Sequence, residues 1–231
     1  MDGGSFIALS NGLQAKGLFV DGVIDVCQFG AKGDGITDDT AAIQNAINAS
    51  KRVYIPSGRY LNNGINVFSN CNIYGDKTKA YAYSSGTTLV CSDTMTSCIT
   101  IQGTGVNISD ITILNASLNK PIYAIGKLDN STSLFNYNIA NVIVNGLFIK
   151  AFSFPYAWDG TFTNCRAEGG LHDIGFYFNT GTSTTLTSCL SYGHTQTGFD
   201  FKFRRLWLLL FSFFRLLYPF FPELWLTYHR F

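Results

Sequence analysis

The sequence predicts an all-β fold, a parallel β-helix of stacked coils whose N-terminal end is capped by an α-helix. From residue 65 to residue 201, short β-branched and aromatic runs alternate with Asn, Gly, Ser and Thr, which is typical of strands joined by turns. Two segments, 162–178 and 186–201, repeat a T-x-C step and a G-F-x-F step 24 and 23 residues apart. Such a period indicates a solenoid in which each coil buries one face on its neighbours.

A β-sandwich is the alternative architecture, because it also joins many short strands by turns. Its turn signals recur at roughly 8 to 12 residues and need not repeat in kind. A leucine-rich horseshoe fits less well, because its consensus leucines are missing.

The composition fits a folded domain with a sizeable core. The chain has 231 residues, of which 46% are apolar and 13% are charged. Residues 1–201 hold 11 Lys or Arg against 14 Asp or Glu, whereas residues 202–231 hold 5 against 1. A weakly acidic body without clustered basic residues argues against a nucleic-acid partner, and an uncharged or acidic glycan suits it better.

The chain divides into four predicted segments. Residues 1–22 form an N-terminal leader, 23–64 the N-terminal cap, 65–201 the coils of the parallel β-helix, and 202–231 an aberrant hydrophobic tail. Within the cap, the apolar run 23–29 predicts a strand, and residues 30–35 predict a turn punctuated by glycines.

A helix is predicted after this turn. Thr37 or Asp38 is the expected N-cap, and Asp38 and Asp39 place negative charge in the first turn, where the helix dipole favours it. The helix should end between residues 50 and 52, and RVYIPSGRYL at 52–61 then predicts a strand, a turn and a second strand. The apolar positions that recur at helical spacing are Ile43, Ala46 and Ile47.

Residues 30–47, GAKGDGITDDTAAIQNAI, also invite two ligand-binding interpretations. A phosphate loop requires G-x-x-x-x-G-K-[ST], and here the glycines are followed by aspartates that would repel phosphate. A calcium loop is suggested by Asp34, Asp38 and Asp39, but the EF-hand order of ligands is absent. We therefore expect a structural role, in which the helix covers the end of the solenoid and its strand edges.

The run from residue 23 to 64, with FGAKGDGITDDTAAIQNAI followed by VYIPSGRYL, resembles the N-terminal signature of the pectate-lyase-like superfamily of right-handed, single-stranded parallel β-helices. The resemblance is to the branch that includes phage tailspikes and capsular polysaccharide depolymerases. It implies a right-handed coil, a polysaccharide substrate, and cleavage by carboxylates as a glycoside hydrolase or a lyase. It also implies a homotrimer for complete relatives, but the signature by itself assigns no catalytic residue.

Candidate site residues gather in the last two repeats. A carboxylic acid beside His or Arg can protonate a glycosidic oxygen or abstract a proton alpha to a uronic carboxylate. The alternative is that these residues are solvated positions in turns between strands. The predicted catalytic residues are Glu168, Asp173, His172 and His194, and the predicted substrate-binding residues are Asp159, Arg166, Trp158 and Tyr192.

The repeat allows a test for paired catalytic acids. Stacked strands lie about 4.8 Å apart, so two acids at equivalent positions of adjacent coils would suit a retaining glycosidase. One period after Asp173 lies Gln196 or Thr197, and one period after Glu168 lies Ser191 or Tyr192. The sequence therefore predicts no stacked acid pair. The two histidines, 22 residues apart, are predicted to lie near each other on adjacent coils.

The six cysteines give no sign of a metal or redox site. They show no C-x-x-C pair and no histidine at ligand spacing, so neither a metal nor a cofactor is predicted. We expect them to be small buried side chains rather than disulfides.

Residues 202–231 break the repeat, because they are rich in Leu, Phe and Trp and contain no Gly, Asn or Asp. The apolar run Leu206–Leu217 is too short to span a membrane and contains Arg215, so a membrane partner is not favoured. An interfacial segment is an alternative. The preferred hypothesis is translation in a shifted reading frame, with further coils encoded in another frame.

The sequence thus predicts a truncated, tailspike-like depolymerase that binds and cleaves a bacterial surface polysaccharide. The predicted location is a virion tail or the extracellular space, although the N-terminus shows no secretory signal. The alternative function is that of a non-catalytic adhesive or structural β-helix.

Overall fold

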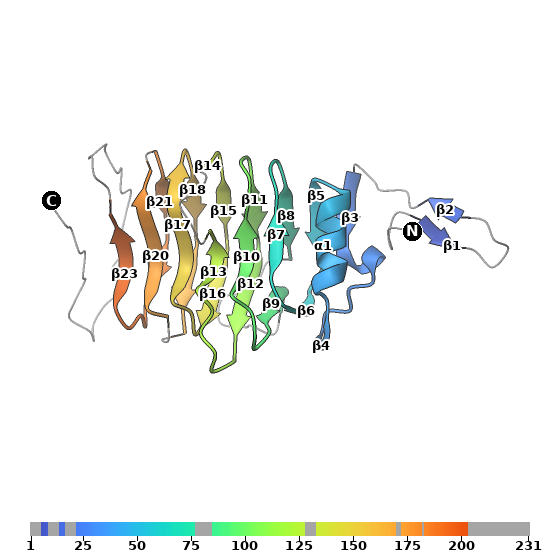
Figure 1. Cartoon of the computed structure of the whole chain (residues 1–231), viewed down its shortest axis with the longest axis horizontal. Coiled ribbons are helices and arrows are strands. Elements are labelled where there is room, and N and C mark those ends of the chain that lie inside the picture. The colour runs from blue at the N-terminus through green and yellow to red at the C-terminus, as the bar shows by residue number, and fades with distance from the viewer. Residues whose placement is uncertain are drawn as a thin grey trace.

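The computed structural model describes residues 6–8, 14–16, 22–76, 85–127, 133–169, 172–181 and 183–202. The fold is all-β, with three parallel sheets wound from successive circuits of the chain (Figure 1). We call each circuit a coil and number the coils 1 to 7 from the N-terminus. This arrangement is consistent with a parallel β-helix, and the β-sandwich alternative is wrong because the stacked strands pair in parallel.

Each coil contributes a strand to each sheet in turn. Sheet I contains β3 (Val23–Asp25), β5 (Arg52–Ile55), β8 (Asn72–Gly75), β11 (Asn107–Ser109), β15 (Asn138–Ala140), β18 (Thr161–Thr163) and β21 (Thr185–Thr187). Sheet II contains β4 (Asp34–Asp38), β6 (Gly58–Asn62), β9 (Thr87–Cys91), β12 (Ile111–Asn115), β16 (Ile143–Gly146), β19 (Arg166–Glu168) and β22 (Leu190–Ser191). Sheet III contains β7 (Ile65–Val67), β10 (Ser97–Ile101), β13 (Tyr123–Gly126), β17 (Lys150–Trp158), β20 (Ile174–Thr180), β23 (Thr197–Phe201) and the side strand β14 (Leu134–Phe135). An antiparallel pair, β1 (Phe6–Ala8) and β2 (Gln14–Lys16), precedes them.

The strand register confirms the period predicted for the last coils. Phe176 lies opposite Phe199, and the pairs that flank Cys165 and Cys189 bring these cysteines opposite each other. Most earlier coils are longer, because loops are inserted between their strands. Ile108 lies opposite Ile139, for example, which is 31 residues further along the chain.

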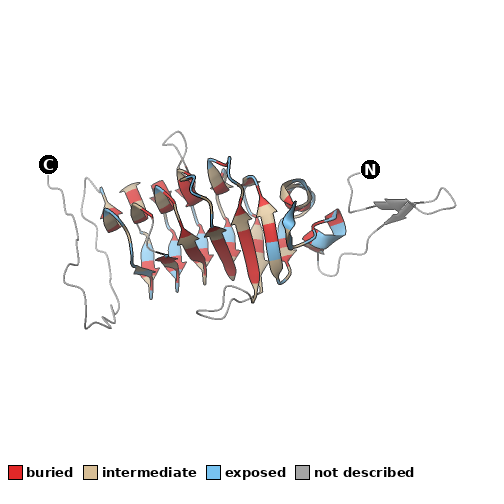
Figure 2. Ribbon diagram, turned by 90° about the horizontal axis from the view of Figure 1, so that it is seen from below, coloured by how far each residue is buried: buried red, intermediate tan, exposed pale blue. Residues whose placement is uncertain are grey.

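The core fills the inside of the coils with apolar side chains from all three sheets. Figure 2 shows buried residues on the strands along the length of the stack. In the later coils this core is aromatic, and Phe162 of β18 contacts rings of its own coil and of the coil before it. The Phe162 ring makes edge-on contacts with five other rings at centroid distances of 4.9 to 6.1 Å. Its neighbours are Tyr137, Phe152, Phe154, Phe176 and Phe178.

Among the described residues, two of the three corners contain single non-glycine residues with left-handed backbone. Asn, Asp and Ser are suited to such positions, because their short polar side chains tolerate this conformation. At the corner from sheet I to sheet II the amides also stack: Asn164 donates to Asn141, and Asn141 donates to Asp110, each at 2.9 Å. The left-handed corner residues are Asp110, Asn141, Asn164 and Ser188 between sheets I and II, and Asn70, Asn136, Asp159 and Ser183 between sheets III and I.

The N-terminal elements differ in detail from those predicted. The predicted strand at 23–29 is β3 followed by the 3₁₀-helix η2 (Val26–Phe29), and the predicted helix is α1 (Thr40–Ala49). The N-cap is Asp39 rather than Thr37 or Asp38, and its side chain makes no capping bond. Instead, the buried Asp39 carboxylate accepts the backbone N–H groups of Lys32 and Gly33, so it fixes the glycine turn.

Helix α1 lies beside the first strand of sheet III. In coil 1 it takes the place that a sheet III strand takes in the later coils, and it buries Ile43, Ala46 and Ile47. The Gln44 amide pairs with the backbone of Asn66 in β7: its nitrogen donates to the carbonyl at 3.1 Å, and its oxygen accepts the N–H at 2.8 Å. The side chain thus satisfies an edge that would otherwise lack a neighbouring strand.

Replacing Gln44 with alanine should remove both bonds to the edge of β7. We expect the free energy of unfolding to fall by about 1–2 kcal/mol, because two partly buried backbone groups lose their partner. Equilibrium denaturation of Gln44→Ala beside Asn45→Ala, an exposed amide on the same helix, measures this difference. Equal stability of the two variants would contradict the edge-pairing role.

Five of the six cysteines are buried and all six are free thiols, so the prediction of small buried side chains is confirmed except at the exposed Cys27. Within the described residues, no helix is long and apolar enough to cross a membrane. The predicted leader lies mostly, and the predicted hydrophobic tail almost entirely, outside the described residues. The reading-frame hypothesis therefore stays a prediction.

Candidate functional site

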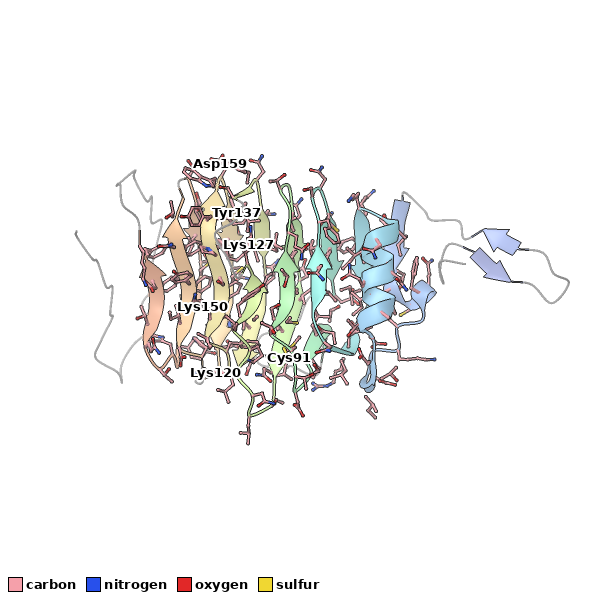
Figure 3. The ribbon with its side chains drawn as sticks, viewed as in Figure 1. Cys91, Lys120, Lys127, Tyr137, Lys150 and Asp159 are labelled. Carbon is pink, nitrogen blue, oxygen red and sulfur yellow. The ribbon has the colours of Figure 1, made fainter. Side chains whose placement is uncertain are left out.

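The corner between sheets II and III brings together side chains from several coils. It is formed by connections of several residues, such as 92–96 of coil 3 and 116–122 of coil 4. Their side chains lie at the outer edge of the stack, where Lys120 projects at the bottom of Figure 3. We call this region the II–III corner.

Asp173 is the best-connected acid of the II–III corner. One of its oxygens, Oδ1, accepts hydrogen bonds from the Lys120 ammonium group, two coils away, and from the Thr195 hydroxyl at 2.6 Å. Partial burial alone would raise the pKa of this carboxyl, but the bonds from Lys120 and Thr195 outweigh it and hold the pKa below its usual value. The Asp173 side chain is 17% exposed, so an ionised carboxylate reaches the surface.

Glu168 and Tyr192 form a second pair on adjacent coils. The Tyr192 hydroxyl donates to Glu168 Oε2 at 2.6 Å, and Tyr192 is 47% exposed while Glu168 is 3% exposed. The strand pairing places Glu168 one position after Ala167, which lies opposite Ser191. The neighbour of Glu168 on the next coil is therefore a tyrosine and not an acid, as the period predicts.

The two histidines are near each other, with ring centroids 6.3 Å apart, as their spacing predicts. His172 is completely buried, and its Nε2 is 3.5 Å from the Ser191 hydroxyl. Burial, together with the nearby His194, lowers the pKa of His172 to about 4, and burial also lowers the pKa of His194. His172 is therefore neutral at pH 7, and its side chain does not contact a polymer that lies outside the coil.

The buried His172 should make stability fall in acid. Its pKa in the folded chain is about 4 against 6.5 for an exposed histidine, so the unfolded chain binds more protons between these pH values. Stability is then fully present above pH 6.5 and is lost as the pH falls toward 4. Between about pH 7 and about pH 4.5, urea denaturation should show the wild type losing roughly 2 kcal/mol more than His172→Gln. If the free energy of unfolding changed with pH in the same way for both proteins, His172 would not be a neutral buried imidazole.

The other predicted binding residues do not all reach the II–III corner. Arg166 lies on the same strand and face as Glu168, two residues before it. Trp158 and Asp159 lie at the opposite end of sheet III, roughly 26 Å from the start of β17. There Trp158 stacks on Phe135 at a centroid distance of 6.2 Å, and the left-handed Asp159 makes the turn into sheet I (Figure 3). These two residues therefore do not form one site with Glu168 and Asp173.

A hollow of about 320 Å³ lies on the N-terminal side of this cluster. It is lined by polar residues of coils 2 and 3, among them Asn63, Thr94, Thr96 and Ser97. Because these residues follow sheet II and lead into sheet III, the hollow lies on the same corner as Asp173. Among the described residues, no group of three or more His, Cys, Asp or Glu side chains is arranged to hold a metal ion.

Two residues that complete the site, Lys120 and Thr195, are absent from the residues predicted from the sequence. Lys120 lies 53 residues before Asp173 in a connection of a longer coil, and no fixed period relates the two positions. Thr195 lies 22 residues after Asp173, close to the repeat period, so the spacing alone was a usable signal for this partner.

Comparisons with known proteins agree with this architecture. The family model described as Rhamnogalacturonase A/epimerase, pectate lyase-like, matches residues 23–209. The chain is 83% identical over 23 residues to the capsule K30/K69-specific Depolymerase 1 of Klebsiella phage K5-2, a match that covers 10% of this chain and 3% of that protein.

Two solved structures share the fold at low sequence identity. The A-module of the mannuronan C-5 epimerase AlgE4 of Azotobacter vinelandii superposes with a TM-score of 0.56 at 19% identity, covering 76% of this chain and 59% of that one. The enzymatically active domain of tailspike protein 2 of bacteriophage CBA120 gives a TM-score of 0.50 at 15% identity, covering 88% of this chain and 36% of that one. The chain thus spans less than two thirds of each of these proteins. Since the family match extends over most of the sequence, the chain belongs to the rhamnogalacturonase A/epimerase family of pectate-lyase-like proteins.

Proposed function

We propose that this protein acts on a polysaccharide as a depolymerase, and that the II–III corner is where the polymer is cleaved. The observation that carries the proposal is the ionised, partly exposed Asp173 held by Lys120 and Thr195 on the outside of the stack. The named relatives support the choice of substrate class: one is a capsule-specific depolymerase, one an epimerase of mannuronan and one a tailspike domain.

Asp173 is suited to the role of base or nucleophile. Its lowered pKa keeps it ionised at neutral pH, so it is poorly suited to donate a proton. The charge of Lys120 would stabilise negative charge that develops near it, for example on a uronic carboxylate during proton abstraction. Asp173 therefore has the properties needed to remove a proton alpha to such a carboxylate. In a hydrolase it could instead attack the anomeric carbon directly, or activate a water molecule that attacks it.

Glu168 and Tyr192 would supply the second functional group. The Tyr192 hydroxyl, hydrogen-bonded to Glu168, is the more exposed member and would donate a proton to the leaving oxygen. Its ring offers a surface on which a sugar can stack. In this proposal His172 supports the corner from within, because burial keeps its ring away from a polymer outside the coil, and the partly buried His194 lies beside it.

The polymer would lie along the axis of the stack. The polar hollow belongs to coils 2 and 3 and Asp173 to coil 6, a separation of roughly 14 Å at the usual strand spacing. Several sugar units would then contact the corner at the same time. We further propose the finer features that the resemblance implies: a right-handed coil, α1 as its N-terminal cap, a homotrimer for the complete protein, and a place in a virion tail or outside the cell.

A non-catalytic adhesive β-helix is the second candidate function. It is favoured by the register, which places Gln196 opposite Asp173 and Tyr192 opposite Glu168, so that no second acid stacks on either carboxylate. A binding protein has no need of such a pair, whereas many glycosidases do.

Incubation of the full chain with polysaccharides separates these functions. The panel should contain bacterial capsular polysaccharides, alginate and pectic polymers, assayed for new reducing ends and for the ultraviolet absorbance of unsaturated uronates. Reducing ends without absorbance would identify a hydrolase, and both together a lyase. Binding without any change in chain length would favour the adhesive function and contradict the depolymerase.

A further inference from the structure

The outer face of sheet III carries a group of charged and aromatic residues that the proposed chemistry does not use. Tyr177 of β20 lies between Ser153 of β17 and Asp200 of β23 in the strand register, so it faces outward at the middle of the last three coils. Lys150 begins β17, and Lys202 follows β23. We call Lys150, Tyr177, Asp200 and Lys202 the Lys–Tyr cluster, and Figure 3 shows Lys150 on this face.

Both lysines are directed at the same tyrosine ring. The Lys150 ammonium nitrogen lies 3.8 Å from the centroid of the Tyr177 ring, and that of Lys202 lies 5.6 Å from it. Lys202 also approaches Asp200 Oδ2 at 3.8 Å, beyond hydrogen-bond distance. An aromatic ring flanked by two cations is therefore held in place by the sheet.

The charges of this cluster do not balance. Among the described residues, two ammonium groups face one carboxylate in this cluster, and the Asp200 side chain is 12% exposed whereas that of Lys202 is 50% exposed. Burial lowers the pKa of Lys150, and the nearby Lys202 lowers it further, while Asp200 opposes both. Burial and the charge of Lys202 both destabilise the charged form of Lys150. An anion bound between the two lysines would stabilise that charged form.

The same face offers hydroxyl groups toward the N-terminal coils. Thr100 Oγ1 is 2.8 Å from the Ser97 hydroxyl and 3.1 Å from the hydroxyl of the buried Tyr123, and the side chains of Ser97 and Thr100 are partly exposed. Hydroxyls of this kind exchange hydrogen bonds with sugars, and aromatic rings such as Tyr177 stack on them. Sheet III therefore combines groups for neutral sugar hydroxyls with a site for negative charge.

We propose that the Lys–Tyr cluster binds the carboxylate of a uronic acid unit in an acidic polysaccharide. The carboxylate lies between the ammonium groups of Lys150 and Lys202, and the sugar ring packs on Tyr177. This inference rests on the proposed function and narrows its substrate class to polymers that carry carboxylates. A neutral glycan has no group to balance the charge of the two lysines.

The test measures binding separately from cleavage. Affinity electrophoresis or equilibrium binding is performed with alginate, polygalacturonate and acidic capsular polysaccharides, each beside its carboxyl-reduced form. All proteins, including the parent, carry Asp173→Asn, so that turnover does not degrade the polymer. The variants are Lys150→Gln, Lys202→Gln and the two combined, and the matched control is Lys51→Gln, an exposed lysine that precedes β5 of sheet I.

We expect at least one acidic polymer to bind, and each cluster variant to bind it about ten-fold more weakly or worse. Reduction of the carboxylates should lower the affinity of the polymer for the parent protein. The affinity should fall to the value that the combined variant shows for the unreduced acidic polymer. Lys51→Gln should leave the affinity unchanged. Lys202 is half-exposed, so we expect Lys202→Gln to fold normally. This variant still tests the site if Lys150→Gln fails to fold.

Three results would overturn the inference: no binding to any acidic polymer, equal binding of the reduced polymer, or equal weakening by Lys51→Gln. Failure of the proposed function would give a different pattern of binding and cleavage. Carboxylate-dependent binding without cleavage by the wild type would retain the Lys–Tyr site and reject the depolymerase. Cleavage of a neutral polymer that the cluster variants still bind normally would retain the depolymerase and reject the site.

Discussion

Replacing Asp173 with asparagine is expected to lower the rate of polysaccharide cleavage by about 10²- to 10⁴-fold, the usual contribution of a general base. The amide cannot accept the proton that the ionised carboxylate accepts. The fold should be retained, because the amide oxygen of the variant would still accept a hydrogen bond from Thr195 and because a partly exposed ion pair contributes little to stability. Initial rates on the polymer identified in the panel measure the effect.

The matched control is Asp110→Asn at the corner between sheets I and II. Asp110 also has a carboxylate that accepts a side-chain bond, from Asn141, and asparagine tolerates its left-handed backbone. This variant should cleave at the wild-type rate. Equal activity of wild type and Asp173→Asn would remove Asp173 from the mechanism.

Replacing Phe162 with alanine is expected to reduce the free energy of unfolding by about 3–5 kcal/mol. The ring is fully buried and contacts phenylalanine rings of β17 and β20, so its loss leaves a cavity where coils 5 and 6 meet. The surrounding strands are fixed by their hydrogen bonds to both neighbouring coils and cannot close that cavity. Chemical denaturation followed by circular dichroism measures the shift in midpoint.

Phe68→Ala is the control for this prediction, because Phe68 is 41% exposed and lies outside the core. It should change stability by less than about 1 kcal/mol. A similar loss in both variants would mean that the aromatic interior does not hold the later coils together.

The fold followed from the sequence where the repeat is regular. Phe176 and Phe199 occupy the same inward position on adjacent coils, so their spacing directly reports the length of a coil. Asp39 shows where local patterns fail. An aspartate before a helix is expected to cap it, yet this carboxylate accepts two backbone N–H groups of the glycine loop instead. The choice between the helix N-terminus and the glycine loop as partners of Asp39 can be seen only in the folded turn.

The arrangement of the candidate residues could be predicted in part. Asp173, Glu168 and Tyr192 lie at one corner because residues one period apart stack on adjacent coils. The burial of His172 could not be predicted, since a turn residue has no strand alternation to show which way its side chain points. The position of Trp158 could not be predicted either. Strand β17 has nine residues, so its C-terminal end, with Trp158, lies at the opposite corner.

A crystal structure of Asp173→Asn with an oligosaccharide of the cleaved polymer would show directly where the sugar chain binds. We expect a sugar chain along the corner between sheets II and III, with a glycosidic oxygen or a ring proton within reach of residue 173 and of the Tyr192 hydroxyl. A sugar chain bound over sheet I, or at the corner that contains Trp158 and Asp159, would contradict it.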